Sequence, residues 1–360
     1  MSAQGTRESI ASILNAGRML ADGIPYPDFR EATERIGDLE EWFDFWAQKG
    51  EAYDRLGSEA LARGDRVSGG EWLWHGSLSF HYAQFMWFHD PARREQGQRR
   101  KVELYSRAAP HFVPPAERVE LAFEGATIPG FLRLPAGDRP SRGWPCALLI
   151  GGLESTKEES YQFENVCLRR GLATFAFDGP GQGEAFFQVK LRPDFERHVS
   201  AVVDYLAGRP ELDLSRLGVL GRSLGGYYAL RAAATDDRLR ACVAWGFFYD
   251  MSDFDTMPPH TQRGFAYVTG LPSFEEGKAY VREALSLEDV AGRLRTPTLL
   301  LNGRNDPIFP PRQMELVVEA LAGAPVEVVI EEAGDHCCHN MGQLVRPRLA
   351  DWLAAELRAP

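Results

Sequence analysis

The stretch GVLGRSLGGYYALRAAA, residues 218–234, joins an apolar run to a helix-forming run through a glycine-rich turn. Its centre is the pattern G-x-S-x-G, with Ser223 between Gly221 and Gly225. Small residues around a serine let the chain turn sharply from strand to helix, which holds the hydroxyl outward in a strained conformation. The bare pattern is common, and an incidental Gly-Ser turn is the alternative. With a strand before it and a helix after it, the stretch predicts a nucleophilic serine at the edge of an α/β sheet.

The residues around this stretch alternate between short apolar runs and helical patterns. The runs are CALLIGG, LATFAFD, RLGVLGR, RACVAWG, TPTLLLNG and VEVVIEE, and residues 194–208 and 311–323 are typical of the intervening helices. Such alternation predicts an α/β fold with a mostly parallel sheet covered on both faces. ERVELAF and IPGFLRL before it predict an antiparallel pair. Residues 250–292 are too long for a simple connection, so we expect a partly helical insertion near the site.

The first third of the chain has a different composition. It carries helical spacing and five of the eight tryptophans, and two prolines at 114–115 mark its end. We therefore expect a helical, cap-like domain over residues 1–115 and a catalytic domain over residues 116–360. Its aromatic block EWLWHGSLSFHYAQFMWF either forms a core or presents Trp74, His75, His81 or Tyr82 to an aromatic substrate.

Composition and charge exclude several classes of protein. The 360 residues carry a net charge of −11, which argues against nucleic acid or an anionic membrane surface as the main partner. No window reaches the roughly 18 apolar residues of a membrane helix, and the first 20 residues lack the apolar run of a secretory signal. Five cysteines, an odd number, fit a reducing compartment. The sequence predicts a cytoplasmic protein.

A serine nucleophile needs an acid and a base, which follow it along the chain in this class of fold. Asp306 comes directly after the apolar run TPTLLLNG, although Asn-Asp-Pro is also good turn chemistry in its own right. His336 lies 30 residues later, in the loop after VEVVIEE. His339, three residues further on, is its rival. The order predicts Ser223, Asp306 and His336 as a catalytic set.

The histidine loop, GDHCCHN, also contains the ligand types of a metal site. Zinc sites use separated ligand pairs because neighbouring side chains rarely point at one ion, and no second ligand cluster follows. A disulfide between Cys337 and Cys338 would strain the backbone. We therefore expect no metal here, and two cysteines that pack behind the loop.

The loop GGLESTKEES, residues 151–160, is the candidate for the oxyanion hole. The N–H of Leu224 would supply one donor, and that of Leu153 or Glu154 the other. In the alternative interpretation, Glu154 is a loop carboxylate that binds Lys157 or caps a helix. FDGPGQGE, residues 177–184, lacks the glycine spacing and the ribose-binding acid of a dinucleotide loop, so we expect a shaped turn near the site and no cofactor.

Together these motifs resemble the α/β-hydrolase superfamily. Within it, the chain resembles a subgroup with a helical N-terminal domain, which includes 2,6-dihydroxypseudooxynicotine hydrolases, fungal polyketide-shortening pigment hydrolases and fermentation-respiration switch proteins. The resemblance lies in GDRVSGGEWLWHGSLSFHYAQF, GGLESTKEE, FDGPGQGE, GRSLGG, NGRNDPIFP and GDHCCHN. It covers nearly the whole chain.

The resemblance implies that Ser223, Asp306 and His336 cleave a carbon–carbon bond next to a ketone, in a 1,3-diketone or polyketide-like aromatic substrate. Some members of the subgroup use a further carboxylate, for which Asp250, Asp253 and Asp255 are candidates, and members are often dimers. A carboxylic ester or lactone hydrolase or an acyltransferase with the same residues is the nearest alternative. A non-catalytic regulator on the same scaffold is a more remote one.

Overall fold

The structure is a computed structural model that describes residues 15–85 and 87–358. The chain divides into two compact units, Met1–Arg118 and Val119–Pro360. The first 20 residues, whose composition predicts no secretory signal, lie mostly outside the described residues. Among the helices that are described, none combines the length and the apolar character needed to cross a bilayer.

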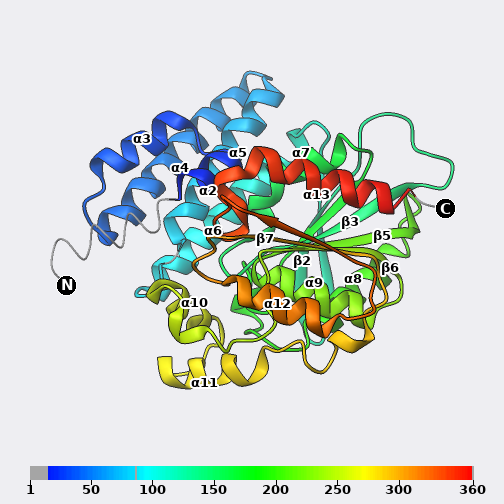
Figure 1. Cartoon of the computed structure of the whole chain (residues 1–360). Coiled ribbons are helices and arrows are strands. Elements are labelled where there is room, and N and C mark those ends of the chain that lie inside the picture. Colours follow the sequence, from blue (N-terminus) through cyan, green and yellow to red (C-terminus); the bar gives the residue numbers. More distant parts are fainter. Residues whose placement is uncertain (1–14, 86, 359–360) are drawn as a thin grey trace. The chain divides into compact units, whose positions relative to one another are not determined.

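The first unit is helical (Figure 1), and its two longest helices pack closely where glycines lie. Its helices are α2 (Ala16–Asp22), α3 (Tyr26–Arg35), α4 (Leu39–Ala62), α5 (Arg66–Gln84) and α6 (Pro91–Ala108). A Cβ added at Gly50 of α4 would lie 2.5 Å from the Phe80 ring of α5, and one added at Gly57 would lie 2.7 Å from Leu73 Cγ. The seven-residue spacing of these glycines keeps one face of α4 flat, so that α5 approaches it.

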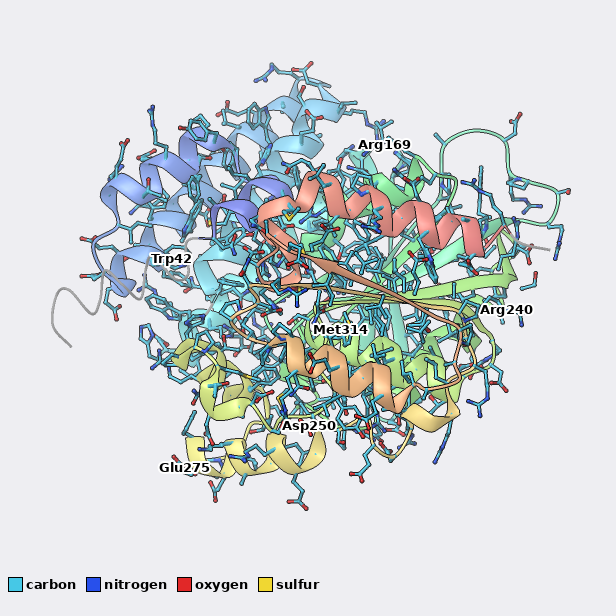
Figure 2. All side chains as sticks on the ribbon, viewed as in Figure 1. Trp42, Arg169, Arg240, Asp250, Glu275 and Met314 are labelled. Carbon is cyan, nitrogen blue, oxygen red and sulfur yellow. The ribbon has the colours of Figure 1, made fainter. Side chains whose placement is uncertain are left out.

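Large aromatic side chains fill the core of this unit. Trp42, labelled in Figure 2, is fully buried, and its indole N–H donates to the carbonyl of Tyr82 at 2.7 Å. The rings of Trp42 and Trp46 meet edge to face, with their centroids 6.0 Å apart. Burying such rings removes a large apolar area from water, which stabilises a bundle of short helices.

The second unit is built on an eight-stranded sheet. Its strands are β1 (Ala116–Phe123), β2 (Ala126–Arg133), β3 (Trp144–Ile150), β4 (Ala173–Phe177), β5 (Leu212–Arg222), β6 (Leu239–Trp245), β7 (Thr298–Gly303) and β8 (Val326–Glu331), in the order β1-β2-β4-β3-β5-β6-β7-β8. β2 runs antiparallel to β4, and every pairing from β4 through β8 is parallel. The predicted mostly parallel α/β sheet is confirmed.

Helices cover both faces of this sheet (Figure 1). On one face lie α8 (Glu196–Leu206), α9 (Leu224–Thr235) and α12 (Pro311–Ala320), and on the other lie α7 (Tyr161–Leu168) and α13 (Gly342–Glu356). α13 approaches β5 closely, because a Cβ added at Gly218 would lie 2.7 Å from Leu353 Cδ1. Parallel strands buried on both faces are expected to be apolar, as β3 and β4 are over nearly their whole length.

The stretch predicted as an insertion contains α10 (Pro259–Val268) and α11 (Phe274–Ala284). Arg231 of α9 fixes the C-terminal end of this insertion. Its guanidinium binds the carboxylates of Glu196 and Asp289 and the carbonyl of Ser286 at 2.8–3.1 Å. This one buried arginine therefore connects α8, α9 and the segment after α11.

The contact between α13 and β5 gives a prediction on stability. Leu353→Ala should lower the free energy of unfolding by about 2–5 kcal/mol, because a fully buried leucine leaves a cavity. Gly218→Ala should destabilise the wild type by crowding Leu353, and less so when Leu353 is already alanine. Denaturant unfolding of the four proteins, followed by circular dichroism, measures this coupling, expected at about 0.5–3 kcal/mol. Strictly additive effects would contradict the close packing.

Candidate active site

Ser223 lies in the turn between β5 and α9 with a strained backbone. Its φ of 60° and ψ of −124° are rare for a residue with a side chain. The Ser223 N–H donates to the carbonyl of Trp245 in β6 at 2.7 Å. Gly225 is required on steric grounds, since a Cβ there would lie 2.3 Å from the carbonyl oxygen of Ile150. The turn therefore presses directly onto the end of β3.

Ser223, His336 and Asp306 form a continuous chain of hydrogen bonds. His336 Nε2 lies 2.9 Å from Ser223 Oγ, and His336 Nδ1 lies 2.7 Å from Asp306 Oδ2. With the proton on Nδ1, the imidazole donates to the carboxylate and Nε2 accepts from the serine hydroxyl. The three residues predicted as a catalytic set thus lie in one place, in the geometry of a nucleophile, a base and an orienting acid.

The carboxylate of Asp306 is held by its own loop. Its Oδ1 accepts the backbone N–H groups of Ile308 and Phe309 at 2.8 and 2.9 Å, which leaves Oδ2 for His336. The Phe309 ring meets the imidazole edge to face at 5.4 Å. The Asn-Asp-Pro turn and the bond to His336 therefore both depend on this one carboxylate.

Burial and charge act in opposite directions on His336. Burial works to lower its pKa, but the charge of Asp306 and the hydrogen bond to it prevail and raise the pKa above the usual 6.5. His336 therefore loses its proton at a higher pH than a free imidazole does. A neutral His336 with a free Nε2 is the form that accepts the serine proton.

Two cysteines with left-handed backbones follow His336. Cys337 and Cys338 have φ values of 53° and 47°, and both are fully buried. Cys337 Sγ lies 3.5 Å from His336 Nε2 and donates to the carbonyl of Trp245 at 3.6 Å. All five cysteines of the chain are free, and burial raises the pKa of Cys338 to about 12. His339 lies to the side, its ring 6.3 Å from that of His336 and 6.1 Å from that of Trp245.

The predicted oxyanion loop lies against the serine. A Cβ added at Gly152 would be 2.8 Å from Ser223 Cβ and 3.3 Å from its Oγ. Leu153 follows Gly152 directly and is buried, as is Glu154. Leu224 is the first residue of α9, where a backbone N–H has no partner within its own helix. The backbone around Leu153 and the N–H of Leu224 therefore flank the serine.

A buried charge cluster lies behind this loop. The Lys157 ammonium binds Glu158, Asp178 and Glu184 at 2.6–2.9 Å. Burial works to lower the pKa of Lys157, but the three carboxylates raise it overall, so the ammonium stays charged. The same carboxylates lie close enough to bind a metal ion, and here Lys157 supplies the positive charge between them. Sequence patterns had not singled out this cluster.

The other residues missed from sequence lie on both sides of the loop. Arg222, beside the serine, pairs with Glu159 at 2.8 Å and donates to Ser155. Gln182 donates to the carbonyl oxygens of Gly151 and Gly152. Gln182 belongs to FDGPGQGE, where the unusual glycines had already indicated a shaped turn near the site.

The candidate additional carboxylates lie after β6 and are occupied by structural contacts. Asp250, beside α12 (Figure 2), accepts from Ser252 and from Gln313, which also donates to Asp253 at 2.7 Å. Burial works to raise the pKa of Asp250, but these hydrogen bonds lower it overall. Asp255 is exposed and forms ion pairs with basic side chains of α11. An ionised Asp250 is poorly suited to donate a proton.

The aromatic candidates all lie on α5, in the helical unit. Tyr82 is fully buried, and its hydroxyl lies 3.2 Å from the carboxylate of Asp22. His81 is buried against it, with the ring centroids 5.1 Å apart. The Trp74 ring packs on His75 at 4.5 Å, and burial lowers the pKa of His75 to about 4. Packing within this unit accounts for much of their surface.

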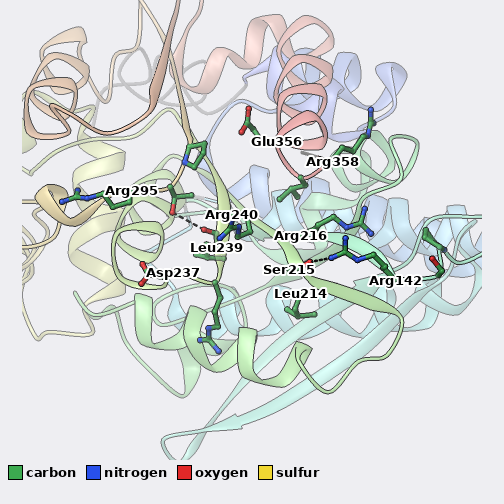
Figure 3. A pocket seen from close by; sticks show the side chains of 16 residues that line it. Arg142, Leu214, Ser215, Arg216, Asp237, Leu239, Arg240, Arg295, Glu356 and Arg358 are labelled. Carbon is green, nitrogen blue, oxygen red and sulfur yellow. Dashed lines mark hydrogen bonds between the residues drawn. The ribbon is translucent and has the colours of Figure 1, made fainter. Parts of the chain in front are cut away.

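A cleft of about 1140 Å³ opens at the N-terminal ends of the strands, beside the first residues of β5 and β6 (Figure 3). Several arginines line it, but Arg142 and Arg216 both pair with Asp213, and Arg238 pairs with Asp236. The side chains of the labelled Arg295 and Arg358 point in different directions (Figure 3). The cleft is therefore separate from Ser223, which lies at the C-terminal end of β5.

Two known hydrolases are similar to this chain in sequence. The 2,6-dihydropseudooxynicotine hydrolase of Paenarthrobacter nicotinovorans is 44% identical over 343 residues, which are 95% of this chain and 91% of that protein. The α/β hydrolase gkaG of Penicillium citrinum is 35% identical over 248 residues, 65% of this chain. The chain spans only 58% of the length of that fungal protein.

Solved structures agree with these matches. The crystal structure of a 2,6-dihydroxy-pseudo-oxynicotine hydrolase superposes with a TM-score of 0.89 at 43% identity, covering 95% of this chain and 96% of that one. AbyA5, at 24% identity and a TM-score of 0.67 over 85% and 86% of the two chains, shares the fold. The sequence profile described as esterase FrsA-like matches residues 36–358. The chain is a hydrolase and belongs to this FrsA-like family of α/β-hydrolases.

Proposed function

We propose that the chain is a serine hydrolase that cleaves a carbon–carbon bond next to a ketone, in a 1,3-diketone or polyketide-like aromatic substrate. The observation that carries the serine mechanism is the hydrogen-bonded chain from Ser223 through His336 to Asp306. The bond type rests on the similarity to the pseudooxynicotine hydrolases, at 44% identity over nearly the whole chain.

The steps follow from the positions of the donors and acceptors. His336 takes the proton of Ser223 as Oγ attacks the ketone carbon, and the N–H groups of Leu224 and Leu153 stabilise the resulting oxyanion. The carbon–carbon bond then breaks with its electron pair on the leaving carbon, which His336 protonates. A water molecule, activated by His336, releases the acyl group from Ser223 as a carboxylic acid. Asp306 keeps the imidazole oriented throughout.

Ester or lactone hydrolysis, or acyl transfer to another acceptor, is the second candidate. The family description names esterases, which favours it. The same oxyanion and the same acyl-enzyme serve both reactions, and they differ in the leaving group. An alkoxide leaves with its charge on oxygen and takes its proton directly from His336, whereas a carbanion needs a neighbouring carbonyl to delocalise its charge. The leaving group of the substrate therefore decides between the two functions.

Three further expectations belong to this proposal. The substrate is aromatic, as the resemblance implies. The enzyme is a homodimer, as the resemblance implies. It works in the cytoplasm, since its five cysteines are free thiols and its net charge of −11 suits neither nucleic acid nor an anionic membrane.

The nucleophile is tested by covalent labelling. A fluorophosphonate should form an adduct on Ser223, because the reagent places its phosphoryl oxygen where the oxyanion forms. Mass spectrometry of the digested protein locates the adduct. Ser223→Ala is the matched control and should remain unlabelled. A folded wild-type protein without an adduct on Ser223 would remove the serine mechanism and favour a non-catalytic regulator.

The bond type is tested by comparing two substrates that share the same aryl acyl group. We expect wild-type enzyme to release the aryl carboxylic acid from an aryl 1,3-diketone, and Ser223→Ala to lose at least about 10³-fold in kcat/KM. Chromatography of both products shows which bond has broken. Turnover of the aryl ester alone would replace carbon–carbon cleavage with ester hydrolysis.

The pH dependence follows from the raised pKa of His336. Only neutral His336 accepts the serine proton, so kcat/KM should rise with pH along a limb whose midpoint lies above 6.5. Asp306→Asn removes the charge that raises this pKa. Its limb should move to lower pH, and its rate should fall by about 10³–10⁴-fold. Profiles of kcat/KM measure both effects, and a limb that Asp306→Asn leaves in place would assign the titration to another group.

A further inference from the structure

The two glycine carbonyls beside Ser223 share one side-chain donor. Gln182 Nε2 lies 2.5 Å from the carbonyl oxygen of Gly151 and 3.3 Å from that of Gly152. Gln182 is almost fully buried, so water cannot take over these bonds. The amide therefore ties the loop FDGPGQGE to the segment that touches the serine.

Planarity of the peptide bond turns this contact into an orientation. In a trans peptide the C=O and the next N–H point in opposite directions. Fixing the carbonyl of Gly152 therefore fixes the direction of the N–H of Leu153, and fixing that of Gly151 fixes the N–H of Gly152. Glycine can adopt more backbone conformations than other residues, so a Gly-Gly segment without such a restraint would rotate about φ and ψ.

The amide of Gln182 is itself held in one orientation. Its Oε1 accepts the N–H of Gly179 at 3.1 Å, which identifies the other end as the NH₂ donor. The carboxylate of Asp178 accepts the N–H groups of Lys157 and Glu184, so it ties both loops together. The left-handed Gly183 leaves room for that carboxylate, because a Cβ there would lie only 2.0 Å from Asp178 Oδ2.

We propose that Gln182 is a positioning residue that aims the backbone N–H of Leu153 at the oxyanion formed on the carbonyl attacked by Ser223. It works through the peptide planes of Gly151 and Gly152 and does not touch the substrate. This inference rests on the proposed serine mechanism. It deepens that mechanism by naming the side chain on which the second oxyanion donor depends.

Only a glutamine side chain meets both requirements at this position. Glutamate has the same shape and keeps an acceptor for Gly179, but it has no NH₂ group and places a carboxylate oxygen against two carbonyl oxygens. Methionine has a similar length and makes neither bond. Gln182→Glu and Gln182→Met thus remove the donor in two different ways. Gln188→Met is the matched control, because exposed Gln188 lies six residues after Gln182, beyond the loop, and binds the N–H of Thr127.

The test combines turnover with the binding of an aryl boronic acid, which forms a tetrahedral adduct on serine with an oxygen in the oxyanion position. Both Gln182 variants should lose about tenfold to hundredfold in kcat, less than the roughly 10²–10³-fold that removing an oxyanion donor costs. KM should change by less than about threefold. The boronate Ki should rise in step with the loss of kcat, and Gln188→Met should match wild type in all three.

The comparison separates positioning from loss of folded enzyme. Fluorophosphonate titration to the endpoint counts active sites, so kcat is expressed per active site in every variant. A variant that only unfolds in part would lose active sites while keeping the wild-type Ki. An unchanged kcat per site, or a lower kcat with an unchanged boronate Ki, would overturn the inference. A wild-type protein without a Ser223 adduct would instead overturn the proposed mechanism, and the inference with it.

Discussion

The geometry of the candidate active site depends on the backbone of Ser223, which is held in a conformation that a residue with a side chain rarely adopts. A φ of 60° costs about 1–3 kcal/mol and persists only where the surroundings compensate for it. Here the compensation is a short hydrogen bond to Trp245 and the contact of Gly225 with the end of β3. Both contacts require adjacent parallel strands in a fixed register. The sheet thus maintains the strained backbone, and this backbone holds the Ser223 hydroxyl out at the C-terminal end of β5.

Parallel pairing also explains why residues far apart in sequence meet at the C-terminal ends of the strands. The carboxyl ends of β3, β5, β7 and β8 lie at the same end of the sheet, with β6 between β5 and β7, and each of the four is followed by one part of the candidate site. The loop after β3 brings Gly152, the turn after β5 brings Ser223, and the loops after β7 and β8 bring Asp306 and His336. Each loop places its functional group by local bonds, so the sheet has to set only the distances between loops.

Groups that are placed by bonds within their own loop could be predicted from sequence, whereas contacts between loops could not. Ser223, Asp306 and His336 each follow an apolar run within a short turn, so local patterns located them, and the mostly parallel sheet followed from the same runs. Gln182 and Lys157 act through contacts with segments about 20–30 residues away, which no local pattern reveals. The charged cluster around Lys157 is buried, whereas charged residues in a loop are ordinarily expected to be exposed. Asp250 was a candidate for its residue type, but its role depends on hydrogen bonds that appear only in the fold.

The first of the two cysteines in the histidine loop, Cys337, contacts a carbonyl group that also binds the serine turn. Trp245 O accepts both the N–H of Ser223 and the thiol of Cys337, so the nucleophile turn and the histidine loop share an anchor. Gly246 follows with a left-handed backbone, and a Cβ there would lie 2.3 Å from Cys337 Sγ. The space beside His336 therefore admits a side chain of a single heavy atom beyond Cβ, and a weak donor suits a carbonyl already bound at 2.7 Å. Packing alone would accept alanine at this position, whereas the thiol adds a contact that links the His336 loop to the Ser223 turn.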